Sequence, residues 1–152
     1  MYLKISVQEA NFNPAEEFKA LRDASKAVGA ICTFTGLVRD LNDDNEVTAL
    51  FLEHYPEMTE KQLVRIVEDA GRRWQLIGVS VVHRIGKLVP GDEIVLVAVA
   101  ASHRGEAFSA CEFIMDYLKT QATFWKKEVG ADGEKWLTMR DSDQIAAERW
   151  QT

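Results

Sequence analysis

The chain has 152 residues, 47% of them hydrophobic, and a formal net charge of −6 at pH 7. This length suits one globular domain over residues 1–152 that buries about 70% of its unfolded surface. The acidic balance argues against a nonspecific nucleic-acid binder, which needs a broad basic field, so any anion site must be a local cluster of basic side chains.

No segment of the sequence indicates export or a membrane. The start, MYLKISVQEANFNP, lacks the basic region and long apolar core of a secretory signal. No run approaches the roughly 20 apolar residues that span a bilayer. We therefore expect a cytoplasmic protein that has no membrane contact.

The first half of the chain predicts one helix followed by two strands. The helix begins after Asn13, which can cap it, and Pro14 fits its first position. The segment GAICTFTGLV (29–38) alternates in the manner of a half-buried strand and is closed by Gly36. EVTALFLEHY (46–55) predicts a second strand.

The middle of the chain predicts a helix and a pair of strands. TEKQLVRIVEDAGRRW (59–74) has the apolar spacing of an amphipathic helix and opens with Thr59 and Gln62 in the spacing of a capping box. GVSVVHRIG (78–86) and DEIVLVAVAAS (92–102) flank a Pro-Gly-Asp turn, so we expect two paired strands, with the second and more apolar one central.

The last third predicts a helix over 106–121, a hairpin with an Asp-Gly turn over 124–139 and a final helix over 141–150. Together these elements indicate an α+β fold with a mixed or antiparallel sheet. Cys32 and Cys111 lie in apolar patterns and are predicted to be buried and reduced. A persulfide on Cys111 is the alternative, although no neighbouring cation or histidine in the sequence favours its thiolate.

The sequence contains none of the common metal, nucleotide or nucleophile motifs, so we predict no metal and no bound cofactor. Basic side chains instead fall at the ends of predicted elements. His103 and Arg104 precede a helix, whose N-terminus attracts anions, which makes sense if a phosphate binds there. Alternatively, Arg104 pairs with Glu106 or faces water. His83, within a strand, is assigned to the solvent face or to cross-strand pairing and left outside the site.

The stretch FIMDYLKTQATFWKKE sets Lys119 and Lys126 among apolar side chains. Lysine stems often lie along apolar surface with the charge in water, which is one explanation. The other is a site in which loss of hydration and a second ammonium group lower a lysine pKa toward neutrality, so that the amine can transfer protons.

Five segments in order resemble the large, catalytic subunit family of molybdopterin synthase. They are TFTGLVRD, LEHYPEMTEKQL, HRIGKLVPGDEIVLVAVAASHRGEAF, FIMDYLKTQATFWKKE and RDSDQIAAERW. The resemblance implies conversion of a cyclic pyranopterin monophosphate into molybdopterin, in molybdenum-cofactor biosynthesis. The sulfur comes from the thiocarboxylated Gly-Gly end of a small ubiquitin-like subunit. It also implies a heterotetramer around a dimer of large subunits, and an α/β-hammerhead-like fold with a small antiparallel β subdomain.

The resemblance assigns the site residue by residue. It implies two catalytic lysines, Lys119 and Lys126, and substrate-binding roles for Arg39, His103, Arg104, Lys127 and Arg140. Arg140 is expected to reach the site from the neighbouring large subunit. The chain departs from a common family form at Leu37, often Lys, and at Thr123, often Pro.

For the two lysines we expect that Lys119 transfers protons or captures substrate covalently, and that Lys126 orients the thiocarboxylate and stabilises an oxyanion. The sequence does not rank these roles. Two other functions stay open: a non-catalytic adaptor that binds anions in the same pocket, and a lysine enzyme that forms a Schiff base with a carbonyl substrate.

Overall fold

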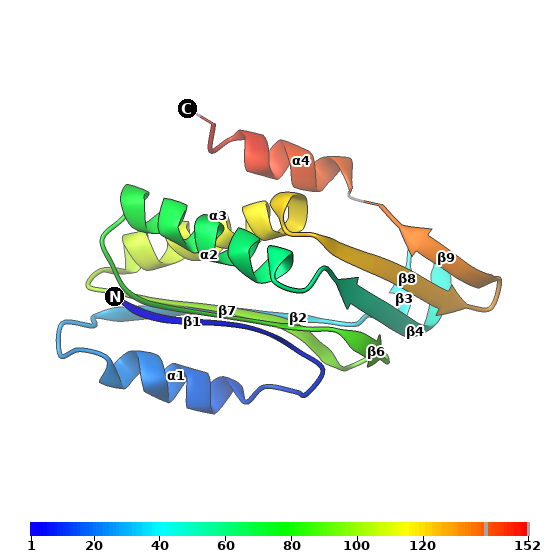
Figure 1. Cartoon of the computed structure of the whole chain (residues 1–152), viewed down its shortest axis with the longest axis horizontal. Helices are drawn as coiled ribbons and strands as arrows, with labels where there is room; N and C mark the ends of the chain where they lie inside the picture. Colours follow the sequence, from blue (N-terminus) through cyan, green and yellow to red (C-terminus); the bar gives the residue numbers. More distant parts are fainter. Residues whose placement is uncertain (139, 152) are drawn as a thin grey trace.

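The computed structural model describes residues 1–138 and 140–151, and a four-stranded sheet runs through its centre (Figure 1). In spatial order its strands are β1 (Tyr2–Gln8), β5 (Leu76–Arg84), β7 (Glu93–Ala101) and β2 (Ala30–Leu37). β1 runs parallel to β5, and the other neighbours are antiparallel. The predicted pairing of β5 with a central β7 is confirmed, whereas β1 was not predicted.

A second, antiparallel sheet extends from one end of the first (Figure 1). Its strands are β3 (Leu41–Asn42), β4 (Asn45–His54), β8 (Phe124–Gly130), β9 (Gly133–Leu137) and β6 (Gly86–Leu88), the last paired with β4. The predicted Asp-Gly hairpin joins β8 to β9. Gly133 has φ of +98° there, a left-handed conformation that favours glycine.

Helices cover both faces of the central sheet. They are α1 (Pro14–Asp23), α2 (Met58–Arg73), α3 (Arg104–Gln121) and α4 (Asp141–Glu148). α1 lies on one face, α2 and α3 lie on the other, and α4 lies outside them next to α3 (Figure 1). None of the helices described is long and apolar enough to cross a membrane. The predicted α+β fold with a mixed sheet is confirmed.

Local sequence signals explain one helix start and fail at another. The Asn13 Oδ1 accepts a hydrogen bond from the Ala15 N–H at 3.0 Å, as an N-cap should. In α2 the predicted capping box is wrong, because the N-cap residue is Glu57 and makes no side-chain cap bond. Thr59 and Gln62 bond instead to a distant segment described below.

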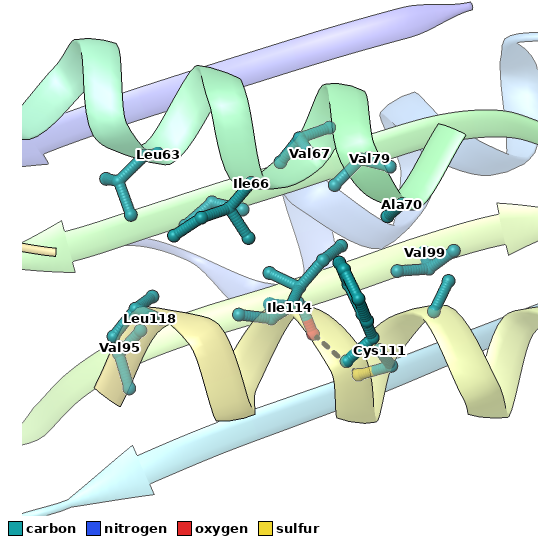
Figure 2. Packing of buried hydrophobic residues seen from close by; sticks show 14 residues of the cluster. Leu63, Ile66, Val67, Ala70, Val79, Val95, Val99, Cys111, Ile114 and Leu118 are labelled. Atoms are coloured by element: carbon teal, nitrogen blue, oxygen red, sulfur yellow. Dashed lines mark hydrogen bonds between the residues drawn. The ribbon is translucent and has the colours of Figure 1, made fainter. Parts of the chain in front are cut away.

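The main core lies between the central sheet and the pair α2 and α3 (Figure 2). Leu63 and Ile66 of α2 meet Ile114 and Leu118 of α3 over the apolar side chains of β5 and β7. The middle of β7 is buried on both faces because helices cover both sides of the sheet, which accounts for its nearly continuous apolar sequence.

Both cysteines are free thiols, and Cys111 is buried as predicted, whereas Cys32 is only half-buried because it lies on the edge strand β2. Cys111 is buried in this core, and its Sγ lies 3.7 Å from the carbonyl oxygen of Val97, the contact drawn in Figure 2. Burial raises the pKa of the Cys111 thiol far above its usual range, which disfavours the reactive thiolate. The environment therefore argues against a sulfur-carrying role for Cys111.

Two isoleucines offer a matched test of this core. Ile114 is fully buried, whereas Ile145 on α4 is 66% exposed. We expect Ile114→Ala to lower the free energy of unfolding by about 2–5 kcal/mol through lost burial and an unfilled cavity. Ile145→Ala should change it by less than about 0.5 kcal/mol. Urea denaturation of both variants measures the difference, and equal losses would contradict the packing described.

Candidate active site

A cavity of about 750 Å³ opens where the two sheets meet at the C-terminal end of α3. Of the predicted site residues it is lined by four, namely Lys119, Lys126, Arg39 and Arg140. The rest of its wall includes apolar side chains of both sheets, among them Leu50, Ile94 and Phe124. Its size lies within the range of about 300–1,000 Å³ that is usual for small-molecule sites.

The two lysines enter the cavity from successive elements. Lys119 lies in the last turn of α3, where the helix dipole favours a cation, and its side chain is exposed. Lys126 lies on β8 and is half-buried. Phe124, Lys126 and Glu128 all line the cavity, because alternate residues of a strand point to the same face.

The environment of Lys126 changes its protonation. Loss of hydration, followed by the nearby ammonium of Lys119, lowers the pKa of Lys126 to about 7, and Asp143 opposes the shift weakly. Near neutral pH a substantial fraction of Lys126 is therefore the free amine. This favours Lys126 for proton transfer, a role that the sequence led us to expect of Lys119.

A chain of hydrogen bonds links Arg140 to β8, the strand that carries Lys126. The Arg140 guanidinium donates to Oδ1 of Asn42, and Nδ2 of Asn42 donates to the buried Glu128 at 2.8 Å. The Arg140 side chain also lies 3.8 Å from Asp43. Arg140 thus lines the cavity of its own chain, and its expected reach into a neighbouring subunit's site stays a prediction.

His83 lines the cavity, although the sequence analysis left it outside the site. It lies on β5 and is 1% exposed, and its ring stacks on Phe124 with centroids 3.8 Å apart and planes 17° from parallel. Nδ1 lies 2.8 Å from the Arg84 carbonyl, which can only accept, so Nδ1 carries the proton. Burial, with smaller repulsion from Lys126 and Lys119, lowers the pKa of His83 to about 3. A histidine inside the apolar run VSVVHRI was the available signal.

His103 and Arg104 lie elsewhere. Both are exposed at the N-terminal end of α3, about 22 Å along the helix axis from Lys119. The Nδ1 of His103 lies 3.8 Å from Glu106, so this histidine, and not Arg104, faces that carboxylate. The expectation that these side chains converge with the lysines on one cavity does not hold within a single chain, and their contact with substrate stays a prediction.

Lys127 also points away from the cavity, since it follows Lys126 on the strand. Its Nζ lies 3.5 Å from Glu134 and 5.0 Å from the centre of the Phe51 ring. Within the part of the chain described, no group of three or more His, Cys, Asp or Glu side chains is placed to hold a metal ion.

The fold and the site define an α+β protein whose cavity joins a lysine pair to apolar walls. The family model described as MoaE protein matches residues 7–121. The chain is 52% identical over 149 residues to the molybdopterin synthase catalytic subunit of Pseudomonas aeruginosa, covering 98% of this chain and 99% of that one. The chain belongs to the MoaE family.

Solved structures agree with this assignment. The molybdopterin biosynthesis MoaE protein from Burkholderia ambifaria superposes with a TM-score of 0.85 at 51% identity, covering 100% of this chain and 99% of that one. A complex of subunits 1 and 2 of molybdopterin-converting factor from Helicobacter pylori matches with a TM-score of 0.70 at 22% identity and 91% coverage of both chains, which shows a shared fold.

The lowered pKa of Lys126 predicts a pH-dependent effect on stability. The pKa of Lys126 falls from 10.5 to about 7 on folding. Below about pH 7 the amine is charged in both states, and its burial lowers the free energy of unfolding by the full amount. This destabilisation disappears as the pH rises toward 10.5. Lys126→Met should therefore raise the melting temperature at about pH 6, and the gain should shrink toward about pH 10.

Thermal unfolding across this range tests the sign of the effect. Lys61→Met, at an exposed position of α2, is the matched control and should show no such trend. A stabilisation by Lys126→Met that grew with pH would contradict the lowered pKa.

Proposed function

We propose that this chain is the catalytic subunit of a molybdopterin synthase and acts as a sulfurtransferase. It transfers sulfur from the thiocarboxylated C-terminus of a small ubiquitin-like subunit to cyclic pyranopterin monophosphate and so forms the dithiolene of molybdopterin. The observation that carries the proposal is the lysine pair in the cavity, with the pKa of Lys126 lowered to about 7, in a chain of the MoaE family.

The cavity has the chemistry that such a substrate requires. Apolar and aromatic walls suit a flat pterin, and the basic side chains around them suit its phosphate. Among the described residues of the wall the basic side chains outnumber the acidic ones, although the whole chain is acidic. The basic ones are Arg39, Lys119, Lys126, Lys135 and Arg140, and the acidic ones are Asp43, Glu128 and Asp143.

A partner that supplies sulfur agrees with the state of the cysteines. Cys111 is buried and its thiol pKa is raised, so it is poorly suited to carry sulfur as a persulfide. The Helicobacter pylori structure of the same fold is a complex of two subunits. A thiocarboxylate on a second chain requires no bound cofactor and no metal from this one.

In the proposed reaction, the partner's thiocarboxylate sulfur forms a carbon–sulfur bond to a side-chain carbon of the pterin, while the carbon–oxygen bond at that carbon breaks and its electron pair leaves with the oxygen. Water then cleaves the resulting thioester, which releases the partner's carboxylate and leaves the sulfur on the substrate. Lys126, present in part as the free amine, accepts the proton of the attacking water. The ammonium of Lys119 stabilises the oxyanion that forms on the thioester carbonyl.

The exposed pair His103 and Arg104 fits a larger assembly. Because they lie about 22 Å along α3 from Lys119, they can contact substrate only in the cavity of a second copy. We therefore propose a heterotetramer built on a dimer of large subunits, in which these residues bind the substrate's anionic groups from the neighbouring chain.

The free amine of Lys126 also favours one other function. A Schiff base with a carbonyl substrate needs an unprotonated lysine, which Lys126 supplies near neutral pH. Borohydride trapping separates the two functions. A reduced adduct at Lys126 with a carbonyl metabolite, formed in the absence of any small subunit, would favour the Schiff-base enzyme.

The sulfur source gives a direct prediction. Incubated with the precursor alone, the protein should form no dithiolene, and adding the thiocarboxylated small subunit should start product formation. The same small subunit bearing an ordinary carboxylate is the control and should be inactive. Turnover on free sulfide at physiological levels, without the partner, would contradict the proposal.

The division of labour between the lysines predicts opposite responses to arginine. Lys126→Arg should lose roughly 10²- to 10⁴-fold in the rate of sulfur transfer, because a guanidinium keeps its proton at working pH. Lys119→Arg should retain measurable activity, because the positive charge survives. Single-turnover sulfur transfer by the preformed complex is the measurement, with thermal unfolding in parallel. The opposite ranking would restore the roles expected from the sequence.

A further inference from the structure

Two residues, Ala122 and Thr123, join α3 to β8 and so connect the elements that carry the two lysines. Both backbone polar groups of Thr123 are held by α2. The Thr123 N–H donates to Oε1 of Gln62 at 2.7 Å, and the hydroxyl of Thr59 donates to the Thr123 carbonyl at 2.9 Å. The next residue, Phe124, is stacked on His83.

The side chains that hold the connector, those of Thr59, Gln62 and His83, belong to α2 and β5, which pack in the main core. Thr59 is completely buried, and its hydroxyl oxygen also accepts a hydrogen bond from the Tyr55 N–H at 3.1 Å. His83 is buried in β5, and its ring is oriented by the bond from Nδ1 to the Arg84 carbonyl. We call Thr59, Gln62 and His83 the connector clamp.

The connector clamp is needed to keep Lys119 and Lys126 at a fixed separation. Two ammonium groups that repel each other, with one losing hydration, would drift apart if the segment between them could move. A misplacement of about 1 Å at a reacting group can cost on the order of 100-fold in rate. The distance between Lys119 and Lys126 is therefore held constant only if the backbone of Ala122 and Thr123 does not move.

Building on the proposed function, we propose that Thr59, Gln62 and His83 are positioning residues of the reaction. By fixing the connector backbone they set the separation and orientation of Lys119 and Lys126. None of the three needs to touch the reacting atoms for this role.

The bond to Gln62 depends on the Thr123 N–H, and a proline at this position would have no N–H to donate to Gln62. A proline would restrict the connector through its own fixed φ instead. Ala122 has φ of −83° and ψ of 134°, the extended conformation that a residue before proline adopts, so Thr123→Pro fits the backbone on that side.

This gives a test in which a second substitution rescues the first. Gln62→Ala leaves the Thr123 N–H without its partner and the connector free to move. We expect it to slow single-turnover sulfur transfer by roughly 10-fold or more. Thr123→Pro should stay near the wild-type rate, and Gln62→Ala combined with Thr123→Pro should return to it. Glu68→Ala, at an exposed site on α2, is the control.

A second readout does not depend on the proposed reaction. In the isolated chain, NMR titration of the ¹³C-labelled side chain of Lys126 reports how far its amine is buried and, in smaller part, how close the Lys119 ammonium lies. Gln62→Ala should raise the pKa of Lys126 from about 7 toward its ordinary value, and the added proline should lower it again. No variant in this set alters the charged groups that line the cavity around the lysines, which are Arg39, Asp43, Glu128, Lys135, Arg140 and Asp143. His83, buried and neutral, is unchanged in this set.

Thr59 extends the test with a conservative rescue. Thr59→Val removes the hydroxyl at nearly constant volume, and it should slow sulfur transfer and raise the pKa of Lys126 as Gln62→Ala does. Thr59→Ser keeps the hydroxyl and should leave both the rate and the pKa near their wild-type values. An unchanged Lys126 titration and rate in both Gln62→Ala and Thr59→Val would overturn the proposal. So would a slowed rate that proline at 123 fails to rescue. If even the wild-type complex transfers no sulfur, the proposed function fails, while the titration still decides whether the clamp sets the lysine pair.

Discussion

The repulsion between two lysine side chains, one of them half-buried, is the constraint on which the site depends. Lys126 loses hydration and faces the ammonium of Lys119, and both effects lower its pKa to about 7. Such an arrangement lowers the stability of the fold, so the surrounding structure must hold it in place. Because the two lysines are held close together, Lys126 can accept and donate protons near neutral pH.

The main core supplies the rigidity that the lysine pair lacks. α2 and α3 share one hydrophobic cluster, and the N-terminal end of α2 lies against the segment that follows α3. The position of Thr123 is thereby tied to well-packed helices and not to an exposed loop. A hydrogen-bond chain from Arg140 through Asn42 to Glu128 also joins another part of the cavity lining to β8. Both lysines are thus bounded by parts of the fold that are hard to displace.

Much of the fold could be predicted because its elements carry strong local patterns. The apolar run of β7 and the periodicity of α2 identify buried elements whatever their partners are. β1 was not predicted, although Tyr2–Gln8 alternates apolar and polar residues as a strand does. Its partner β5 lies far away in the sequence, and such pairing leaves no local signature.

The site was predicted in part for a similar reason. The resemblance located Lys119, Lys126, Arg39 and Arg140, and the cavity brings these four together. It gave no distances, so the separation of His103 and Arg104 from that cavity became visible in the structure alone.

Side chains with two possible partners were the least predictable. Thr59 and Gln62 have the spacing of a capping box, yet they bond to Thr123, 61 residues beyond Gln62. His83 looked like an ordinary strand residue until its burial and its stacking on Phe124 were known. A local motif identifies which groups can form hydrogen bonds, but the tertiary fold decides which ones do.

The topology of the central sheet has a consequence for how the chain is made. β1 and β2 are its two edges, and each pairs with a strand from the 76–101 region. As the protein leaves the ribosome, each edge strand emerges well before its partner, so β1 waits unpaired while residues 9–75 are made and β2 waits while residues 38–92 are made. Closing such long loops is slow, and exposed strands can associate with other chains in the meantime. Newly made protein is thus most vulnerable to aggregation just before β5 and β7 appear.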